Sequence, residues 1–183
     1  MYMTKTFATE GIVLKRINVG EADRVVTLFT RGFGKLACVA KGVRKLSSSK
    51  KSALEPGMYS KIFCAESRGM PILTQAQVIE DYPNTRDTLH ATRNLVQILE
   101  ILDAMTVEEN GQEVVFEQVL AILRSMNAHT STRSKIAEML RKLLAELGFH
   151  EVDDRFKTVS EFVEHLSERK MKSFGYLTVK EKS

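Results

Sequence analysis

The hydrophobic pattern of this sequence changes its period near residue 83, and this change most constrains the fold. Before it, five short apolar stretches run over residues 11–17, 24–30, 35–41, 58–65 and 72–79. Turn segments such as "RGFG" and "EPG" separate them, which is typical of short strands joined by tight connections. Residues 1–82 are therefore predicted to form a compact five-stranded barrel or sandwich.

The fifth stretch shows a clear alternation of side chains. The residues that share one of its faces are Ile72, Ala76 and Val78, whereas Gln75 and Gln77 point away from that face. Successive side chains of a strand lie on opposite sides of the sheet. This segment is therefore predicted to be a half-buried antiparallel strand with a wet outer side.

After residue 83 the apolar residues recur with helical spacing, so the second half is predicted to be all-α. Helices are expected over 86–106, around 115–123, over 133–147 and near 159–170. The first is expected to bury a stripe of six residues: Leu89, Leu95, Val96, Ile98, Leu99 and Leu102. Gly148 is expected to end the third helix, and Thr158 and Glu161 have capping-box spacing before the fourth. The predicted fold class is α+β, with domains at 1–82 and 83–183.

The charge is concentrated in the first half of the chain. Residues 1–82 contain 13 Lys and Arg against 7 Asp and Glu, a net charge of +6, whereas residues 83–183 contain 14 against 16, a net of −2. A basic half joined to a mildly acidic half suggests that the first domain meets a polyanion. The alternative is that the charge only keeps the chain soluble.

The segment "AKGVRKLSSSKK" at residues 40–51 carries five cations and no acid. It lies between two predicted strands, and its serines and glycine predict a flexible loop. A five-stranded basic barrel fits the OB-fold, whose sheet face and loops bind single-stranded nucleic acid. In this interpretation the loop is an electrostatic clamp whose serines bond phosphate oxygens.

The fourth stretch offers a surface for such binding. Tyr59, Lys61 and Phe63 alternate onto one face, whereas Met58, Ile62 and Cys64 lie on the other, and either face is compatible with the core. An exposed Tyr59 beside Lys61 would be a platform on which a base stacks. The candidate nucleic-acid contacts are Arg16, Arg24, Lys35, Lys41, Arg44, Lys45, Lys50, Lys51, Tyr59 and Lys61. The pattern is equally compatible with a second role for four of them, that of ordinary surface charges at strand ends: Arg16, Arg24, Lys35 and Lys41.

The order and spacing of several motifs resemble a known family. The stretch "GIVLKRINVGEADRVVTLFTRGFGKLACVAKGVRK", followed by "LEPG" and "LTQAQVIEDYP", is similar to the N-terminal region of RecO proteins, which are bacterial recombination mediators. "TRDTLHATRNLVQILEILD" and "MLRKLLAELGF" resemble later helices of that family, so the resemblance covers about residues 9–150. It implies an N-terminal OB-fold followed by a helical domain.

The resemblance also implies an activity. RecO proteins bind single- and double-stranded DNA, anneal complementary strands, and help load recombinase onto strands coated by single-strand-binding protein. The implied partners are this DNA, the C-terminal tail of single-strand-binding protein, and a RecR-type protein. The implied location is the cytoplasm, in association with the nucleoid. Many family members continue into a cysteine-rich zinc segment, whereas residues 150–183 contain no cysteine.

The tail of single-strand-binding protein is acidic and ends in apolar residues, so its site needs an apolar pocket rimmed by cations. The predicted helix 133–147 has this mixture, with leucines at 140, 143, 144 and 147 beside several cations. Arg141 and Lys142 are the candidate tail contacts. The alternative is that the leucines all face the helical core and the cations face water.

No motif of the sequence points to an enzyme. Nucleotide-binding glycine loops and nucleophile elbows are absent, and the four histidines lie far apart. "FHEVDD" at residues 149–154 lacks the regular spacing of a metal site. The two cysteines, Cys38 and Cys64, cannot complete a structural zinc site, so no metal and no cofactor are expected. A second hypothesis is a basic adaptor that binds RNA or an acidic protein tail without annealing.

Overall fold

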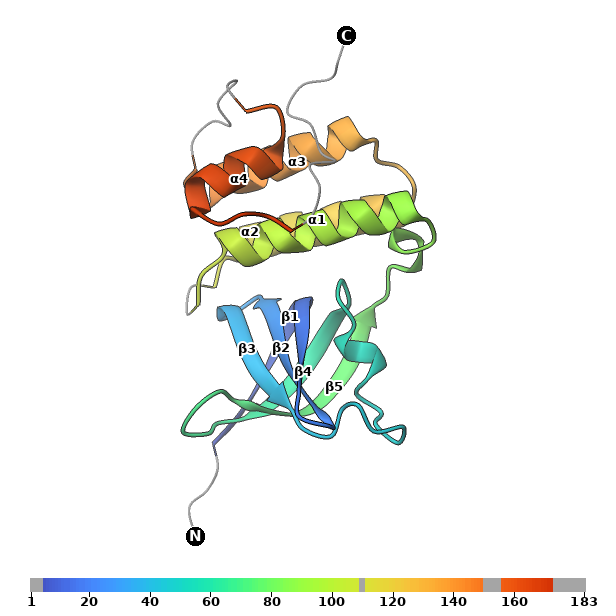
Figure 1. Ribbon diagram of the computed structural model, residues 1–183, viewed down its shortest axis with the longest axis vertical. Helices are drawn as coiled ribbons and strands as arrows, with labels where there is room; N and C mark the ends of the chain where they lie inside the picture. The colour runs from blue at the N-terminus through green and yellow to red at the C-terminus, as the bar shows by residue number, and fades with distance from the viewer. Residues whose placement is uncertain (1–4, 109–110, 150–155, 173–183) are drawn as a thin grey trace. The chain divides into compact units, whose positions relative to one another are not determined.

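The computed structural model describes residues 5–108, 111–149 and 156–172 (Figure 1). The chain divides into two compact units, one of residues 1–81 with 107–112 and the other of residues 82–106 with 113–183. The short segment 107–112 thus belongs to the first unit, although the residues on both sides of it belong to the second. The sequence pattern does not predict this.

The first unit is a closed barrel with the strand order β1-β2-β3-β5-β4 (Figure 1). Its strands are β1 (Thr6–Val19), β2 (Asp23–Thr30), β3 (Gly34–Ala40), β4 (Tyr59–Ala65) and β5 (Ile72–Glu80). All neighbouring pairs are antiparallel except β3 and β5, which are parallel and joined by a single bridge between Val39 and Ile72. The predicted α+β class with an N-terminal OB-fold barrel is confirmed.

Strand β1 is longer than its apolar stretch suggests. It pairs with β4 over Thr6–Ile12 and with β2 over Gly11–Val19, with a register shift between Val13 and Lys15. Its first residues, "TFATE", precede the apolar stretch at 11–17, and all of them pair with β4. A long, bent first strand that serves two neighbours is what closes the barrel.

Strand β5 contains a bulge that changes its inward face. Phe63 pairs with Gln75 and Cys64 with Leu73, so Thr74 is the extra residue. The prediction that Val78 is buried was wrong, since its side chain is 43% exposed, whereas Leu73 is buried. The bulge at Thr74 explains why Leu73 rather than Ile72 is buried, because it shifts by one the residues that face the interior. Val78 lies beyond this bulge, next to a second register shift between Tyr59 and Ser60 of β4.

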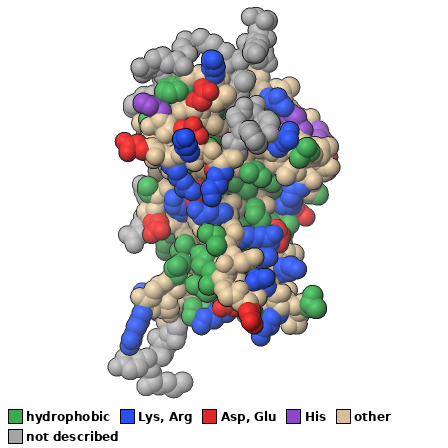
Figure 2. All heavy atoms as spheres, in the orientation of Figure 1, with side chains coloured by type: hydrophobic (Ala, Val, Ile, Leu, Met, Phe, Trp, Pro, Cys, Tyr) green, Lys and Arg blue, Asp and Glu red, His purple; other side chains and the backbone are tan. Residues whose placement is uncertain are grey.

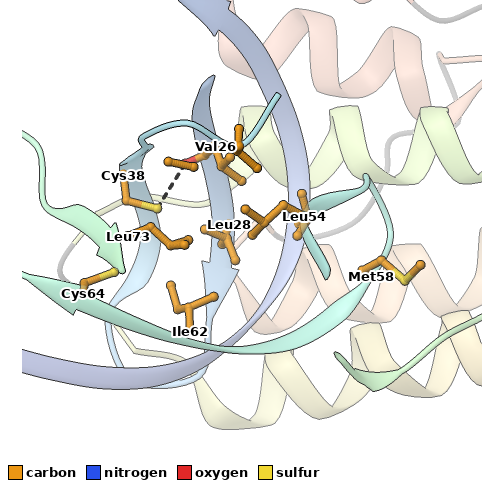
Figure 3. Close-up of a cluster of buried hydrophobic side chains, with 11 residues drawn as sticks. Val26, Leu28, Cys38, Leu54, Met58, Ile62, Cys64 and Leu73 are labelled. Carbon is orange, nitrogen blue, oxygen red and sulfur yellow. Dashed lines mark hydrogen bonds between the residues drawn. The ribbon is translucent and has the colours of Figure 1, made fainter. Parts of the chain in front are cut away.

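The barrel core is filled from every strand and from the β3–β4 connection (Figure 3). Met58, Ile62 and Cys64 belong to this core cluster, so the opposite face of β4 points outward. Cys38 and Cys64 are both buried and free, and the Cys38 thiol lies 3.7 Å from the Val26 carbonyl oxygen. The hydrogen bond shared with Cys64, together with burial, raises the pKa of Cys38. Both thiols act as small apolar core groups.

The second unit contains four α-helices after a short 3₁₀ turn, Pro83–Thr85. The helices are α1 (Leu89–Met105), α2 (Glu113–Asn127), α3 (Arg133–Glu146) and α4 (Val159–Ser167). Leu89 and Val96 were wrongly assigned to the buried stripe of α1, because they are 66% and 49% exposed. Their places are taken by Ile101 and by the buried polar residue Gln97, which donates to the Ser160 hydroxyl of α4.

The predicted helix ends are confirmed at three positions. Thr132 and Thr158 cap α3 and α4 by accepting from backbone N–H groups three residues later. Gly148 has φ +89°, and it and Phe149 donate to the carbonyls of Ala145 and Leu144. This pair of bonds is the Schellman motif, which glycine favours because it tolerates the left-handed conformation.

Within the parts of the chain that the structure describes, none of the helices combines the length and the apolar composition needed to cross a bilayer.

Candidate nucleic-acid interface

The basic loop, residues 41–51, is tied at its root to the turn between β1 and β2. The Gly42 N–H donates to the Asp23 carboxylate at 2.7 Å, and the Arg44 N–H donates to the Ala22 carbonyl at 3.0 Å. Gly42 has φ +65°, a conformation that few other residues adopt. Val43 is fully buried in the barrel core. The loop therefore leaves the barrel in a defined direction.

Further bonds organise the rest of the basic loop into turns. The Lys45 N–H donates to the Gly42 carbonyl and the Ser48 N–H to the Lys45 carbonyl, each at 3.1 Å. The Lys50 ammonium lies 3.3 Å from the Lys41 carbonyl oxygen and closes the loop on itself. The sequence predicted a flexible clamp, and the structure shows that hydrogen bonds fold this clamp into successive turns.

The basic loop and β5 enclose a groove of about 570 Å³, which we call the loop groove. It is lined by Lys41, Gly42, the three serines 47–49, Lys50 and the β5 residues 74–77. None of these lining residues is acidic. The groove thus offers two ammonium groups, three serine hydroxyls and the side chains of Thr74, Gln75 and Gln77. Cations and hydroxyls bind phosphate oxygens, and amides bond to base edges or sugars.

The other predicted cations lie outside the lining of the loop groove. Arg44, Lys45 and Lys51 are exposed on the same loop, and the Arg44 guanidinium donates to the Gly20 carbonyl at 3.0 Å. Lys61 is exposed on the outer face of β4, 5.7 Å from the centre of the Phe63 ring. Lys35 is half-buried at the start of β3, away from the groove.

Arg16 and Arg24 are held by Glu55, and neither is fully exposed. Arg16 donates to the Glu55 carboxylate, and Arg24 lies 3.8 Å from the same oxygen. Arg24 also donates to the Asn18 side chain at 3.0 Å and is only 9% exposed. Its burial, with the nearby Arg16 charge, lowers the pKa of Arg24 against the opposing pull of Glu55. Arg24 is too buried to contact a phosphate, whereas Arg16, whose side chain is 30% exposed, stays a candidate contact.

Tyr59 is not a stacking platform. Its ring is buried, and its hydroxyl donates to the Glu10 carboxylate at 2.6 Å. Burial, and next the bond to Glu10, raise the pKa of Tyr59. A base cannot reach a ring that is 5% exposed, so the aromatic contact predicted at this position was wrong.

Comparison with known proteins identifies the barrel. Residues 3–82 match the family model described as "Recombination protein O N terminal". The DNA repair protein RecO of Bacillus pumilus is 31% identical over 140 residues, which are 76% of this chain and 55% of that protein. The chain belongs to the RecO family.

Two further relatives show how the similarity is distributed. The DNA repair protein RecO of Bacillus subtilis is 28% identical over 141 residues, covering 77% of this chain and 55% of that protein. The RecO protein of Bifidobacterium longum strain NCC 2705 is 42% identical over 76 residues, covering 42% of this chain and 32% of that protein. The chain spans about half the length of the RecO proteins from the two Bacillus species.

The pocket predicted on helix α3 of this RecO-family chain lacks its apolar surface. Leu140, Leu143 and Leu144 are fully buried, and Leu147 is half-buried. Lys142 is exposed but lies 2.8 Å from Glu138, one helical turn away. Arg141 is half-buried on the same helix. Leu140, Leu143 and Leu144 therefore belong to the helical core, as the alternative interpretation predicts.

Metal-binding side chains do not gather in the described residues 5–108, 111–149 and 156–172, where no three His, Cys, Asp or Glu form a possible site. His90 accepts from the Arg133 guanidinium at 2.7 Å, and His129 lies 3.7 Å from Asp87. Most of the "FHEVDD" segment, residues 150–154, lies outside the described residues.

The sequence did not identify two parts of the interface. The first is the polar face of β5 at Thr74, Gln75 and Gln77, although the alternation "TQAQ" had marked the two glutamines as outward. The second is Asp23, which a sequence reading takes for a turn acid and which holds the basic loop at Gly42. Neither the meeting of β5 with the basic loop nor the bond between Asp23 and Gly42 is visible in the sequence, because the partners lie 19 or more residues apart.

Proposed function

We propose that this RecO-family chain is a DNA-binding recombination mediator in DNA repair and homologous recombination. In this proposal it binds single- and double-stranded DNA, anneals complementary strands, and assists recombinase loading on strands coated by single-strand-binding protein. The observation that carries the proposal is the loop groove, a cationic hollow without lining acids on an OB-fold barrel. Relatives named as DNA repair proteins support the biological setting.

The proposed mechanism is charge neutralisation rather than bond chemistry. Lys41 and Lys50 neutralise phosphates inside the loop groove, while Lys45 and Lys51 are exposed on the loop beside it. Two polyanionic strands approach each other only when part of their charge is screened, and weak contacts allow mispaired strands to dissociate. The folded basic loop presents its cations without a large ordering cost. No catalytic group is required.

The partners are part of the same proposal. They are DNA, the acidic tail of single-strand-binding protein and a RecR-type protein, and the place of action is the cytoplasm at the nucleoid. Of the tail-binding residues, Arg141 and Lys142 remain candidates as charges, with half-buried Leu147 as the nearest apolar group on their helix.

A second candidate is an adaptor that binds RNA or acidic protein tails without annealing. The burial of Tyr59 favours it, because no aromatic residue lines the loop groove. Cations, hydroxyls and amides bind phosphate and carboxylate alike, whatever carries them.

An annealing assay separates the two candidates. Complementary oligonucleotides, labelled at opposite ends, are mixed with the chain in the presence and absence of single-strand-binding protein. The mediator proposal predicts accelerated pairing under both conditions. Tight binding of the single strands without any acceleration favours the adaptor, and absence of binding overturns the mediator proposal.

A further inference from the structure

A second hollow on the barrel is apolar and aromatic. We call it the aromatic hollow; it has a volume of about 650 Å³, within the roughly 300–1,000 Å³ typical of small-ligand sites. Its apolar lining comes from β1, the β2–β3 turn, β3 and the β4–β5 loop, and includes Phe7, Phe33, Leu36 and Met70. The loop groove does not share any of its lining residues.

The two hollows lie along one seam of the barrel, where β3 and β5 run parallel. The aromatic hollow is lined by residues 35–37 of β3 and 69–71, and the loop groove by residues 41–42 and 74–77. The single bridge between Val39 and Ile72 lies between them. From Ala37 to Lys41 a strand advances about 13 Å, at roughly 3.3 Å per residue. A ligand a few nucleotides long that follows this seam reaches both hollows.

The aromatic hollow contains a supported, partly exposed ring. Phe33 packs on Phe7 with ring centroids 5.2 Å apart and an interplanar angle of 58°. Phe7 in turn packs against the buried core cluster of the barrel. Phe33 is nevertheless 41% exposed and Met70 is 49% exposed. Figure 2 shows hydrophobic and basic side chains side by side on the surface over the barrel. A ring fixed from behind and open in front suits the stacking of a planar group.

The backbone of β3 adds one hydrogen-bond donor and one acceptor to the aromatic hollow. The Lys35 N–H bonds to Val107 and the Val39 N–H to Pro71, so these residues turn their polar groups away from β2. In an antiparallel ladder this direction recurs at every second residue, and Ala37 therefore turns its N–H and C=O to the same edge. Among the described residues, no hydrogen bond satisfies the Ala37 N–H or the Ala37 C=O. Ala37 lines the hollow.

The charge of the rim favours an uncharged guest. Two lysines, Lys5 and Lys35, and two acids, Glu66 and Glu108, line the aromatic hollow, and Lys5 lies 3.8 Å from Glu66. These charges balance, whereas the loop groove has only cations. A phosphate is thus favoured in the loop groove, and a neutral, planar, hydrogen-bonding group in the aromatic hollow.

We propose that the aromatic hollow binds a nucleobase of the single strand whose phosphates lie in the loop groove. The base stacks on Phe33, contacts Met70, and bonds through its edge to the Ala37 N–H and C=O. Every base carries donors and acceptors on its edge, so the subsite tolerates any sequence. This inference rests on the proposed function and places a base-binding subsite beside its phosphate-binding groove.

The test compares strands with and without bases. Affinities are measured over a salt series for a homopolymeric oligonucleotide and for an abasic oligomer of equal length, with the wild type, Phe33→Ala and Phe33→Trp. Because stacking contributes about 1–3 kcal/mol per base, Phe33→Ala should weaken binding to the base-bearing strand by about 5- to 150-fold. Binding to the abasic strand and the salt slope should not change, and Phe33→Trp should retain affinity. The matched control is Leu89→Ala, which removes a 66% exposed leucine from α1, outside the barrel.

Each outcome decides a separate point. If wild type binds both strands and Phe33→Ala loses nothing, or loses equally on both, the base-binding subsite is refuted and the proposed function stands. If wild type binds neither strand, both proposals fall. A thermal unfolding curve for Phe33→Ala that matches wild type excludes misfolding as the cause of a loss, and Met70→Ala gives an independent reading of the same hollow. Binding of an apolar peptide that Phe33→Ala abolishes, without any base dependence, would assign the hollow to a protein partner instead.

Discussion

The bond between Asp23 and Gly42 predicts how the basic loop is held. Replacing Asp23 by Ala removes an ionised acceptor 2.7 Å from the Gly42 N–H, at the point where the loop leaves β3. Hydrogen bonds to charged groups contribute about 1.5–3 kcal/mol, and Asp23 is half-buried, so the lower part of this range applies. We expect a loss of about 1–2 kcal/mol in the free energy of unfolding, measured by urea titration.

Two further variants separate the bond from the charge. Asp23→Asn keeps an acceptor and should lose less than about 1 kcal/mol, because a neutral hydrogen bond still contributes about 0.5–1.5 kcal/mol. Glu21→Ala removes an exposed acid from the same turn and should leave stability unchanged within about 0.5 kcal/mol.

The same variants report on the order of the basic loop. Asp23→Asn should bind single-stranded DNA as tightly as wild type or more tightly, since a negative charge near the phosphates is gone. Asp23→Ala should bind less tightly than Asp23→Asn, because the loop must then be ordered on binding. Equal stability of wild type and Asp23→Ala, or equal DNA affinity of the two Asp23 variants, would refute the claim that this bond organises the loop.

Three other expectations concern separate parts of the molecule. Burial raises the pKa of Tyr59 in the folded protein. The stability that this shift contributes is complete below about pH 10, where an unfolded tyrosine ionises, and is lost as the pH rises through the folded pKa. Between pH 8 and pH 11, the free energy of unfolding measured in urea should therefore fall more for wild type than for Tyr59→Phe. Titration of a labelled tail peptide of single-strand-binding protein should give weaker binding to the Arg141→Glu, Lys142→Glu variant, and equal affinity removes these residues from the site. Elemental analysis should find less than one zinc per chain, and stoichiometric zinc would contradict the sequence argument from two core cysteines.

Sequence patterns located the elements of this fold better than their orientation. The change of period at residue 83 and the signals at Thr158 and Gly148 depend on neighbours within a few residues, and these predictions are confirmed. In β5, Leu73 rather than Ile72 is buried, because the bulge at Thr74 is set by the pairing with β4 rather than by local sequence, and Val78 is exposed, contrary to the prediction. Leu89 and Val96 were grouped with the apolar stripe of α1, but at about 100° per residue they lie on the side of the helix opposite Ile98.

The site illustrates the same distinction at the level of charges. The basic loop was visible because its cations are clustered in the sequence, and two of its four lysines line a groove. Arg24 looked equally accessible, yet its environment depends on Glu55, 31 residues away, and on burial beneath it. For Tyr59, alternation grouped it with Lys61 and Phe63 on one face of β4 but left open which face is buried. The exposure of its ring was also not predictable, because the Glu10 carboxylate that bonds its hydroxyl comes from another strand.

The salt dependence of DNA binding tests the central claim, that the basic loop contacts phosphates, most directly. The loop variant changes Arg44, Lys45, Lys50 and Lys51 to Glu, and the control changes the exposed cations Lys135, Lys157, Lys170 and Lys172 of the other unit to Glu. Each variant has a formal net charge of +4 − 8 = −4, so a general charge effect is the same in both. Each lost phosphate contact removes about 0.7 from the log–log salt slope for single strands, so the loop variant should lose up to about 3. The account predicts this flattening in the loop variant and an unchanged slope in the control, and equal slopes in the two variants would contradict it.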